Sequence, residues 1–563
     1  MAQAGWLRAL PALTLLAMLG PVAAGLAGTV LPAFGHMPGI GAQGPSLAPF
    51  VALLAWPGLG AAVWTSVFTG LMATVLSLGA VVLITAGWWG TRPFHWFERA
   101  LSPLLAVPHA AAAFGLAFLI APSGWLARLA SPALTGWARP PDWLIVHDPW
   151  GLSLVAGLVA KEVPFLLLMT LAALAQADVA RSLRVAQALG HGRIAAWLFC
   201  VFPRVYAQTR LAVFVVLVFG MTVVDVALIL GPSTPPPLAV QILRWMGDPD
   251  LSQRMTAAAG ALVQLALVLG ALAAWIGLER LVARAGCLWI MAGLRGRGGS
   301  AARAAGLGLG AASALAVLGG LACLAVWSVA GFWGFPDPLP AFAGLTNWAR
   351  YGPGLWDATA DTVLVAGAAV GLAVLLVLGC LEAEHRSGRA LRTRGLWLIY
   401  LPLLVPQIAF LPGLQTLLLQ IGADTGVAPV IAAHLVFVLP YVFLSLGDPW
   451  RAWDTRHARV AAALGAAPGA VFWRVRLPML LRPVLTAAAV GFAVSVGQYL
   501  PTLLIGGGRV ATLTTEAVAL AAGGDRRAIG VHGIAQTAAA LLPFAIAIAL
   551  PAIVWRKRRG LHG

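Results

Sequence analysis

The sequence predicts an all-α membrane protein with about 12 transmembrane helices, built as two parallel six-helix repeats that each carry a cytoplasmic loop. Three observations lead to this fold class. Of the 563 residues, 60% are hydrophobic and 10% are charged, whereas soluble domains average about 25% charged residues. Apolar runs of about 20 residues, the length that crosses the hydrocarbon core, recur along the whole chain. One stretch between two such runs, Arg184–Pro203, returns 275 residues later as Arg459–Pro478.

The first apolar run ends in PVAAGLAG, which mimics the small-residue cleavage site of a signal peptide. We interpret this run as a retained first span, because its removal would leave the first half with only five spans. Twelve spans then place both termini in the cytoplasm. The predicted spans cover residues 9–29, 65–87, 101–121, 151–174, 211–231 and 257–278 in the first half, and 306–331, 362–381, 396–419, 428–447, 485–505 and 531–554 in the second.

Arginine is concentrated in the segments that this topology places in the cytoplasm, including the basic end Arg556–Arg559. The net charge of +17 therefore reflects membrane topology, and no nucleic-acid partner is expected. Three parts of the chain follow from this reading. They are a first transmembrane domain at 1–280, a cytoplasmic Arg- and Gly-rich linker at 281–305 and a second transmembrane domain at 306–563.

The duplication extends beyond the loops. Matching pairs are Leu228/Leu503, Gly231/Gly506 and Leu238/Leu513 at the same offset, Val107-Pro108-His109 with Val405-Pro406-Gln407 in the third spans, and Pro164-Phe165 with Pro440-Tyr441 in the fourth. Both halves therefore have the same orientation in the membrane. Parallel repeats of this kind occur in several classes of transporter.

Each copy of the loop has the pattern of a helix, a bare turn and a second helix. An Ala-rich run ends at a glycine, which leaves a gap in side-chain cover, and an amphipathic run of twelve residues then ends at a proline. Aligned without a gap, the copies share Arg184/Arg459, Ala186/Ala461, Gly190/Gly465 and Pro203/Pro478, among others.

These residues resemble the cytoplasmic loop of the membrane permeases of binding-protein-dependent ABC importers. That loop reads Glu-Ala-Ala, three residues, Gly, nine residues, Ile, one residue, Leu-Pro. The residues that fall on this spacing are Ala186, Gly190 and Pro203 in the first copy, and Ala461, Gly465, Val475, Leu477 and Pro478 in the second. The family's opening Glu is replaced by Arg184 and by Arg459. Fusion of both halves in one chain looks most like the ferric-iron and thiamine permeases.

The resemblance implies an inner-membrane permease, not an enzyme, that imports a small solute delivered by a periplasmic binding protein. It also implies two copies of a cytoplasmic ABC ATPase as partners, beside the lipid bilayer. The implied ATPase-coupling residues are Arg184, Ala186, Gly190, Pro203, Arg459, Ala461, Gly465 and Pro478. ATP would bind the partner, because neither lysine of this chain, Lys161 or Lys557, follows a glycine as a phosphate loop requires. No cofactor is expected in this chain, and the solute stays open between thiamine-like, ferric iron and other classes.

Two charges, Lys161 and Glu162, lie within the fourth predicted span, where each costs about 2.5–3.5 kcal/mol to insert. Neighbours in sequence point about 100° apart on a helix, so the two are not expected to pair with each other. Asp225 of the fifth span is the expected partner of Lys161 in a structural ion pair that tethers two spans. A role in solute binding is the alternative.

Five polar residues are candidates for the translocation path. His109 and Gln407 each follow a proline that frees a backbone carbonyl in the third span, where polar groups can line a water-filled path. A kinked helix with one satisfied side chain is an equal alternative. Asp225, Gln498 and Tyr499 precede the glycine-terminated turns of the two fifth spans. We expect them to face the seam between the halves.

Two other classes of protein remain as alternatives. A secondary transporter would also have six plus six spans, but its basic loops usually follow the second span and the chain centre, whereas these follow the fourth and tenth. A membrane-embedded enzyme would need acidic or His-rich motifs at a membrane face, and no Cys, His or Glu cluster has metal-ligand spacing. The importer permease is the interpretation that explains both loops.

Overall fold

The computed structural model describes residues 5–296, 298–388, 393–423 and 426–554. In these ranges the regular elements are helices, and only two isolated β-bridges occur, Met37 with Ala42 and Ala330 with Ala343. Ten helices are long and apolar enough to cross a membrane, or up to 12 if each of two bent pairs is one span. The predicted fold class is confirmed. The basic end Arg556–Arg559 lies outside the described residues.

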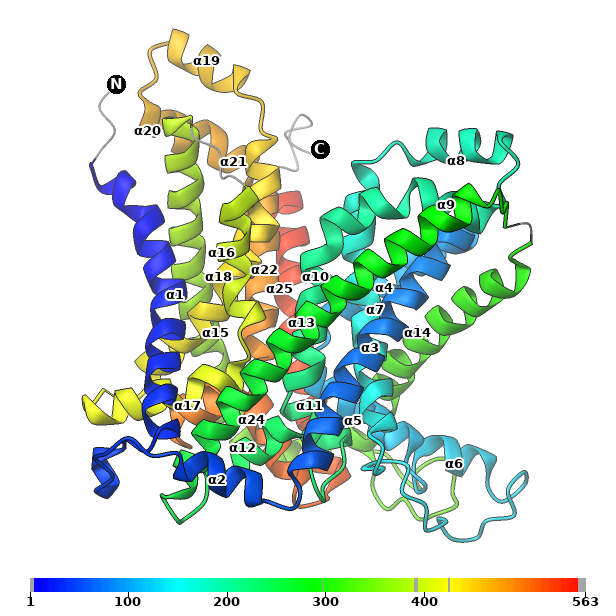
Figure 1. Cartoon of the computed structure of the whole chain (residues 1–563), viewed down its shortest axis with the longest axis vertical. Coiled ribbons are helices and arrows are strands. Elements are labelled where there is room, and N and C mark those ends of the chain that lie inside the picture. The colour runs from blue at the N-terminus through cyan, green and yellow to red at the C-terminus, as the bar shows by residue number, and fades with distance from the viewer. Residues whose placement is uncertain (1–4, 297, 389–392, 424–425, 555–563) are drawn as a thin grey trace.

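The helices of the first half carry the labels of Figure 1. They are α1 (Gly5–Ala33), α2 (Ala48–Ala55), α3 (Leu59–Trp88), α4 (Arg92–Leu101), α5 (His109–Ile120), α6 (Trp125–Ala130), α7 (Leu152–Ala175), α8 (Val179–Ala188), α9 (Arg193–Cys200), α10 (Phe202–Thr222), α11 (Asp225–Leu230), α12 (Leu238–Met246) and α13 (Gln253–Met291).

The helices of the second half follow the same order. They are α14 (Ser300–Val329), α15 (Thr346–Ser387), α16 (Thr393–Leu404), α17 (Gln407–Gln420), α18 (Val427–Arg451), α19 (Arg456–Ala463), α20 (Pro468–Val471), α21 (Leu477–Met479), α22 (Leu481–Val496), α23 (Leu500–Gly506), α24 (Leu513–Ala521) and α25 (Arg526–Val554). A π-helical turn, Phe472–Arg476, joins α20 to α21.

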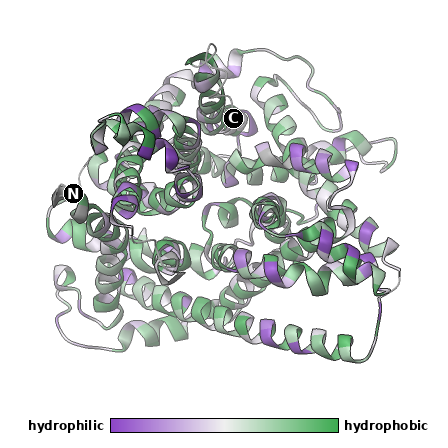
Figure 2. Ribbon diagram, turned by 90° about the horizontal axis from the view of Figure 1, so that it is seen from above, coloured by the Kyte–Doolittle hydropathy of each residue, from purple (hydrophilic) through white to green (hydrophobic). Residues whose placement is uncertain are grey.

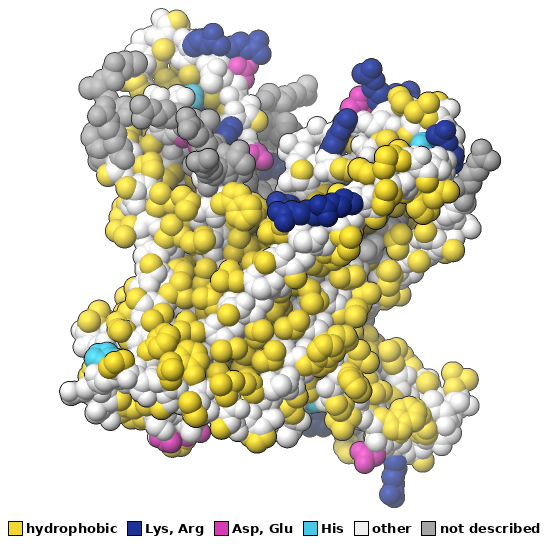
Figure 3. All heavy atoms as spheres, in the orientation of Figure 1, with side chains coloured by type: hydrophobic (Ala, Val, Ile, Leu, Met, Phe, Trp, Pro, Cys, Tyr) yellow, Lys and Arg dark blue, Asp and Glu magenta, His cyan; other side chains and the backbone are white. Residues whose placement is uncertain are grey.

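Two groups of helices meet at one end of the molecule and diverge toward the other (Figure 1). The diverging ends carry α8 and α9 on one group and α19 and α20 on the other, and α1 begins and α25 ends at this same side. The space-filling view shows a notch between the two tips and places most of the visible Lys and Arg side chains around it (Figure 3). Hydrophobic residues cover most helices (Figure 2), as expected of surfaces that face lipid.

The first long helix of each half crosses to the other half. α1 packs most on α17 of the second half and then on α13 and α15, and α14 packs most on α5 of the first half and then on α25 and α3. Glycines allow these crossings: side chains at Gly25 and Gly28 would collide with the α17 backbone, and one at Gly320 would collide with that of Gly115 in α5. Small residues at helix interfaces let backbones approach closely in membranes. The two packing units therefore exchange their first helices, which the division into 1–280 and 306–563 did not anticipate.

The segment predicted as a linker, 281–305, is helical over most of its length. α13 continues without interruption to Met291, and α14 begins at Ser300. Its leucine, alanine and arginine residues are good helix formers, so the long span simply extends out of the membrane. The connection itself covers only residues 292–299, and Gly299 has a φ of +115°.

Four predicted spans are broken instead of continuous. In the third spans, α5 begins after Pro108 and α17 after Pro406, and the α16 segment is bent by 83° against α17. Proline disfavours helical backbone in the preceding residue, which explains both breaks. In the fifth spans, α10 ends before Val223 and α22 before Gly497, and the short helices α11 and α23 follow. The predictions of unbroken helices over 101–121, 211–231, 396–419 and 485–505 are wrong at these points.

Candidate functional site

The duplicated loops have the same backbone geometry. In the first, α8 ends at a left-handed Gly190 (φ +88°), where Gly190 N–H bonds to the Gln187 carbonyl at 2.9 Å and His191 N–H to the Ala186 carbonyl at 3.2 Å. In the second, Gly465 (φ +85°) donates to Ala462 at 2.9 Å and Ala466 to Ala461 at 3.0 Å. This left-handed cap explains the glycine at both positions.

The space beside each glycine is empty. A Cβ built on Gly190 or on Gly465 would meet no atom within 4 Å. The predicted bare turn is thus present, although its immediate cause is the positive φ. A partner surface could approach both turns without obstruction.

Exposed apolar side chains stand before both glycines, a feature that the sequence reasoning missed. Leu189 is 63% exposed and its equivalent Leu464 is 84% exposed, and Val185 and Val460, one helical turn earlier, are also exposed. Residues four apart share a face of a helix. The repeat offset that matches the glycines also matches these two pairs and was the available signal. Exposed apolar groups at the same position of both loops are typical of an interaction surface.

The other predicted coupling residues divide into surface and framework positions. Arg184 and Arg459 are exposed on α8 and α19, whereas Ala186 is buried beneath α8. Ala461 is partly buried. Pro203 and Pro478 lie in the first turns of α10 and α21, where the missing N–H of proline costs nothing.

The loops are anchored to the membrane helices by different contacts. In the first, the buried Trp197 packs in a core beneath α8, and Arg193 donates to the carbonyls of Ala86 (3.1 Å) and Trp89 (2.6 Å). In the second, Arg476 is 3% exposed, pairs with Glu382 at 3.1 Å and donates to the Trp450 carbonyl at 3.1 Å. Its guanidinium lies 4.3 Å from the Trp450 ring centroid, a geometry that stabilises cations.

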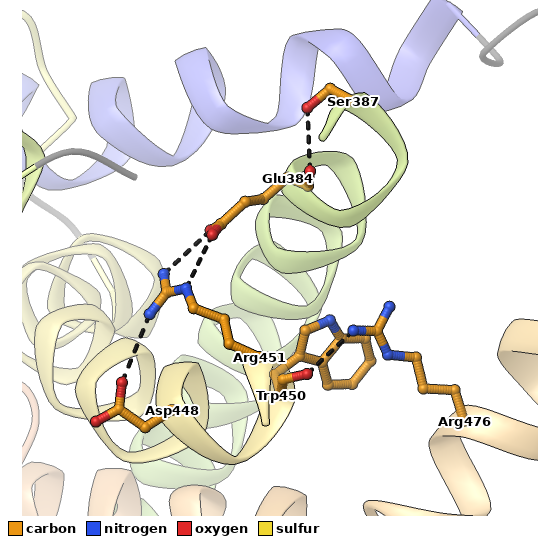
Figure 4. Close-up of polar contacts among 6 residues, drawn as sticks. All are labelled: Glu384, Ser387, Asp448, Trp450, Arg451 and Arg476. Atoms are coloured by element: carbon orange, nitrogen blue, oxygen red, sulfur yellow. Dashed lines mark hydrogen bonds and ion pairs between the residues drawn. The ribbon is translucent and has the colours of Figure 1, made fainter. Parts of the chain in front are cut away.

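Arg451 strengthens the second anchor. Its guanidinium bonds to both Glu384 carboxylate oxygens, at 2.8 and 3.0 Å, which ties α18 to α15, and also approaches Asp448 at 3.7 Å (Figure 4). At the start of α19, Asp454 accepts the Arg456 backbone N–H at 2.9 Å and the Arg456 side chain at 2.7 Å. These bonds favour the carboxylate, so the pKa of Asp454 lies below its usual value. The tip of the second half is thus fixed by charged contacts.

The five candidate path residues all lie at helix breaks. His109 and Gln407 are the first residues of α5 and α17. Asp225 is the first residue of α11, and Gln498 and Tyr499 fill the break between α22 and α23. In Figure 1, α5, α11 and α17 lie below the notch, in the part of the molecule away from the loops.

The structure joins three of these side chains and Glu162 in two pairs, one pair in each half. His109 Nε2 lies 3.4 Å from Glu162 Oε1, and Gln407 donates to Gln498 Oε1 at 3.3 Å. Asp225 interacts electrostatically with His109 of its own half and with Tyr499 of the other half. We name these residues, Glu162 included, the polar cluster: His109, Glu162, Asp225, Gln407, Gln498 and Tyr499.

Lys161 is not paired with Asp225, so the expected ion pair is wrong. Its Nζ donates to the backbone carbonyls of Leu104 (2.7 Å), Leu105 (3.3 Å) and Val107 (2.6 Å). The break at Pro108 takes these carbonyls out of a continuous α-helix, although Leu104 also accepts the Val107 N–H at 3.3 Å. An ammonium group has three protons to offer them. Lys161 therefore tethers the third span and not the fifth.

Among the described residues, no group of three or more His, Cys, Asp and Glu side chains could hold a metal ion. The amides, carboxylates and rings of the cluster can contact a polar solute between the halves. An all-helical membrane protein with two matched surface loops at one end and a polar seam between its halves belongs to the class of transport permeases.

Comparison with known proteins identifies the family. The chain is 31% identical over 520 residues to the inner membrane ABC transporter permease protein YnjC of Escherichia coli K12, covering 92% of this chain and 93% of that protein. Residues 366–556 match the family described as "Binding-protein-dependent transport system inner membrane component". The chain therefore belongs to the inner-membrane permeases of binding-protein-dependent ABC transporters.

Two further relatives match one part of the chain. The molybdenum transport system permease protein ModB of Mycobacterium tuberculosis is 33% identical over 189 residues, which cover 31% of this chain and 72% of ModB. The putrescine transport system permease protein PotI of Escherichia coli K12 is 27% identical over 157 residues, covering 26% of this chain and 55% of PotI. No solved structure is significantly similar to the chain.

Proposed function

We propose that this permease imports a small solute that a periplasmic binding protein delivers, and that two copies of a separate cytoplasmic ATPase drive the import. One chain supplies both transmembrane halves. ATP binds and is hydrolysed on the partner, and the permease changes only its conformation. The observation that carries the proposal is the pair of loops with one backbone geometry and one exposed apolar pair, at the same end of the molecule.

The match between the loops supports two identical ATPase subunits. Leu189 and Leu464 occupy the same place before a left-handed glycine, and beside each glycine there is free space. One type of groove on the ATPase subunit can therefore receive both loops. The anchors below the loops differ, which leaves the docking surfaces alike while the two membrane halves differ. Arg184 and Arg459 add an exposed cation beside each surface, so we expect an acidic patch on the ATPase.

The diverging arrangement suggests how docking drives transport. ATP-bound subunits that close on each other would draw the two loops together, and hydrolysis would release them, which shifts the population between two states of the permease. The state in Figure 1 has its tips apart. In our proposal these tips and both termini face the cytoplasm, so the notch opens inward and the polar cluster lines the path beneath it.

The test is whether the two leucines hold the ATPase. Leu189→Asp combined with Leu464→Asp places two charges in the proposed apolar contact, and we expect the ATPase subunit to be lost from the purified complex along with uptake into proteoliposomes. Leu134→Asp is the matched control, because Leu134 is an exposed leucine between α6 and α7, at the end of the molecule away from both loops. Full ATP-driven uptake by the double variant would contradict the proposal.

A further inference from the structure

We propose that the polar cluster is a binding site for a positively charged solute and that Asp225 supplies its counter-charge. This inference rests on the proposed function, because it names the class of solute that the path accepts. It concerns charge alone, so organic and inorganic cations remain equal candidates. Its basis is the juxtaposition of a buried carboxylate without a side-chain partner and the rings and amides of both halves.

Asp225 is the central observation. The residue is 7% exposed, and no side chain in the described parts of the chain forms a hydrogen bond or an ion pair with its carboxylate. Only backbone N–H groups at the start of α11 and the electrostatic interaction with His109 favour its charge. An isolated charge is costly inside a membrane protein and usually marks a functional site. A cationic solute would provide the missing partner.

The other membrane charges do not neutralise Asp225. Lys161, the nearest lysine in sequence, gives its protons to three backbone carbonyls. Glu162 is a second carboxylate, and its partner is His109 at 3.4 Å. Without His109, the charges of Lys161, Glu162 and Asp225 sum to one net negative charge beside the cluster. An anionic solute would be repelled there, whereas a cation would be attracted.

The neighbouring rings suit a cation as well. The His109 ring lies 4.7 Å from the ring of Phe219, which is partly exposed. Tyr499, which belongs to the opposite half and interacts electrostatically with Asp225, is also partly exposed. Aromatic faces attract cations through their quadrupole. Carboxylates on one side and a tyrosine on the other would therefore surround a cationic group at the seam.

Several side chains of the cluster are partly exposed. The side chain of His109 is 38% exposed, and Gln407 and Gln498 are partly exposed. Exposed amides and imidazoles are unfavourable against lipid, and polar groups at membrane depth face protein or water-filled space. We therefore assign their exposed surfaces to the space between the halves.

The experiment measures the local charge with two thiol reagents and needs no identified solute. All four cysteines, Cys200, Cys287, Cys323 and Cys380, are free and are replaced by alanine. A single cysteine is introduced as Gln498→Cys in the full chain in nanodiscs. Its modification rate is measured with a trimethylammonium-ethyl and with a sulfonato-ethyl methanethiosulfonate. Ala48→Cys, on the exposed start of α2, gives the reference ratio of the two rates.

We expect the ratio of cationic to anionic modification at Gln498→Cys to exceed the reference by about five-fold, the effect of one nearby charge on two reagents of opposite sign. Asp225→Asn should abolish this excess. Asp454→Asn, at the loop end of the molecule, should leave it unchanged. If Gln498→Cys does not fold, Gln407→Cys serves in its place.

Three results would overturn the inference. They are a ratio at or below the reference, a ratio that Asp225→Asn leaves unchanged, and no modification of the introduced cysteine by either reagent. The measurement involves neither the ATPase nor the binding protein. A failed charge test beside intact coupling would leave the proposed function standing, and the reverse result would leave the cation site standing.

Discussion

At the scale of single residues, the proline at the start of α5 interrupts the helix, and Lys161 donates hydrogen bonds to the backbone carbonyls before it. Three carbonyls before Pro108 accept from one buried ammonium group. The next residue, Glu162, holds the imidazole that follows the proline. The two adjacent charged residues of α7 thus contact the chain on both sides of the break at Pro108. These contacts hold the position of His109 between the halves.

Lys161→Met should therefore destabilise the permease by about 3 kcal/mol, because buried carbonyls lose their donor. Denaturant-induced unfolding of the purified chain would measure this loss. Asp225→Leu should change stability by the same amount in the Lys161→Met background as in the wild type, because the two side chains do not pair. A clearly larger gain in the Lys161→Met background would instead restore the hypothesis of an ion pair between the two residues.

The candidate site residues were predictable because each has a sequence signal. Polar residues are rare in apolar spans, and His109 and Gln407 follow prolines in duplicated positions. Their partners were not predictable. The sequence showed that Lys161 needed a partner, but Asp225 was the only obvious counter-charge, and backbone carbonyls carry no signal in the sequence.

At the scale of elements, a buried glutamine of the sixth span supports the break of the fifth span in each half. Gln264 of α13 is fully buried and donates to the Met221 carbonyl at 3.1 Å, just before α10 ends. In the second half, Gln536 of α25 donates to the Thr514 hydroxyl, which in turn donates to the Val496 carbonyl at the end of α22. Met221 and Val496 match at the repeat offset. The amide of the sixth span therefore reaches the carbonyl at the break directly in the first half and through the Thr514 hydroxyl in the second.

Gln264→Met and Gln536→Met should each lower the free energy of unfolding by about 1–3 kcal/mol, because each strands a buried polar group. Gln208→Met is the matched control, since Gln208 is exposed on α10 and should change stability by less than about 0.5 kcal/mol. Thermal unfolding in detergent would compare the three. Equal stability of all three variants would show that these glutamines do not hold the breaks.

The positions of the spans could be predicted well, and their breaks only in part. Hydropathy gives the length of an apolar run, and Pro108 and Pro406 give a physical reason for the breaks in the third spans. Val223 and Val224 offer no such reason, because neither residue excludes a helix. The breaks there depend on tertiary contacts, including those of Gln264, which lies far along the chain.

At the scale of the whole molecule, one topology accounts for the loops and the notch. Reporter fusions after Arg210, Arg303 and Arg482 should report the cytoplasm, and fusions within Pro232–Pro237 and Gly506–Arg509 should report the outside. The reason is that α8 and α19 lie at one end of the molecule and the polar cluster lies toward the other. An outside signal after Arg210 or Arg482 would remove the coupling function of the loops.

The two-fold repeat was visible in the sequence, but the exchange of first helices was not. Periodicity shows that α1 and α14 are apolar, and the composition of a helix does not name its neighbour. In the sequence, nothing distinguishes Gly25 and Gly28, which pack on α17, from the many other glycines of the chain. Only the packed structure shows which of them are contacts.

The exchange also has a consequence for biosynthesis. α1 leaves the ribosome first, yet the helix that covers its glycines, α17, is made only after the entire first half and much of the second. Until α17 is made, Gly25 and Gly28 have no α17 backbone to pack against, and α13 is the main neighbour of α1 in the first half. We therefore expect a chain that stops after α13 to leave the glycine face of α1 without its partner.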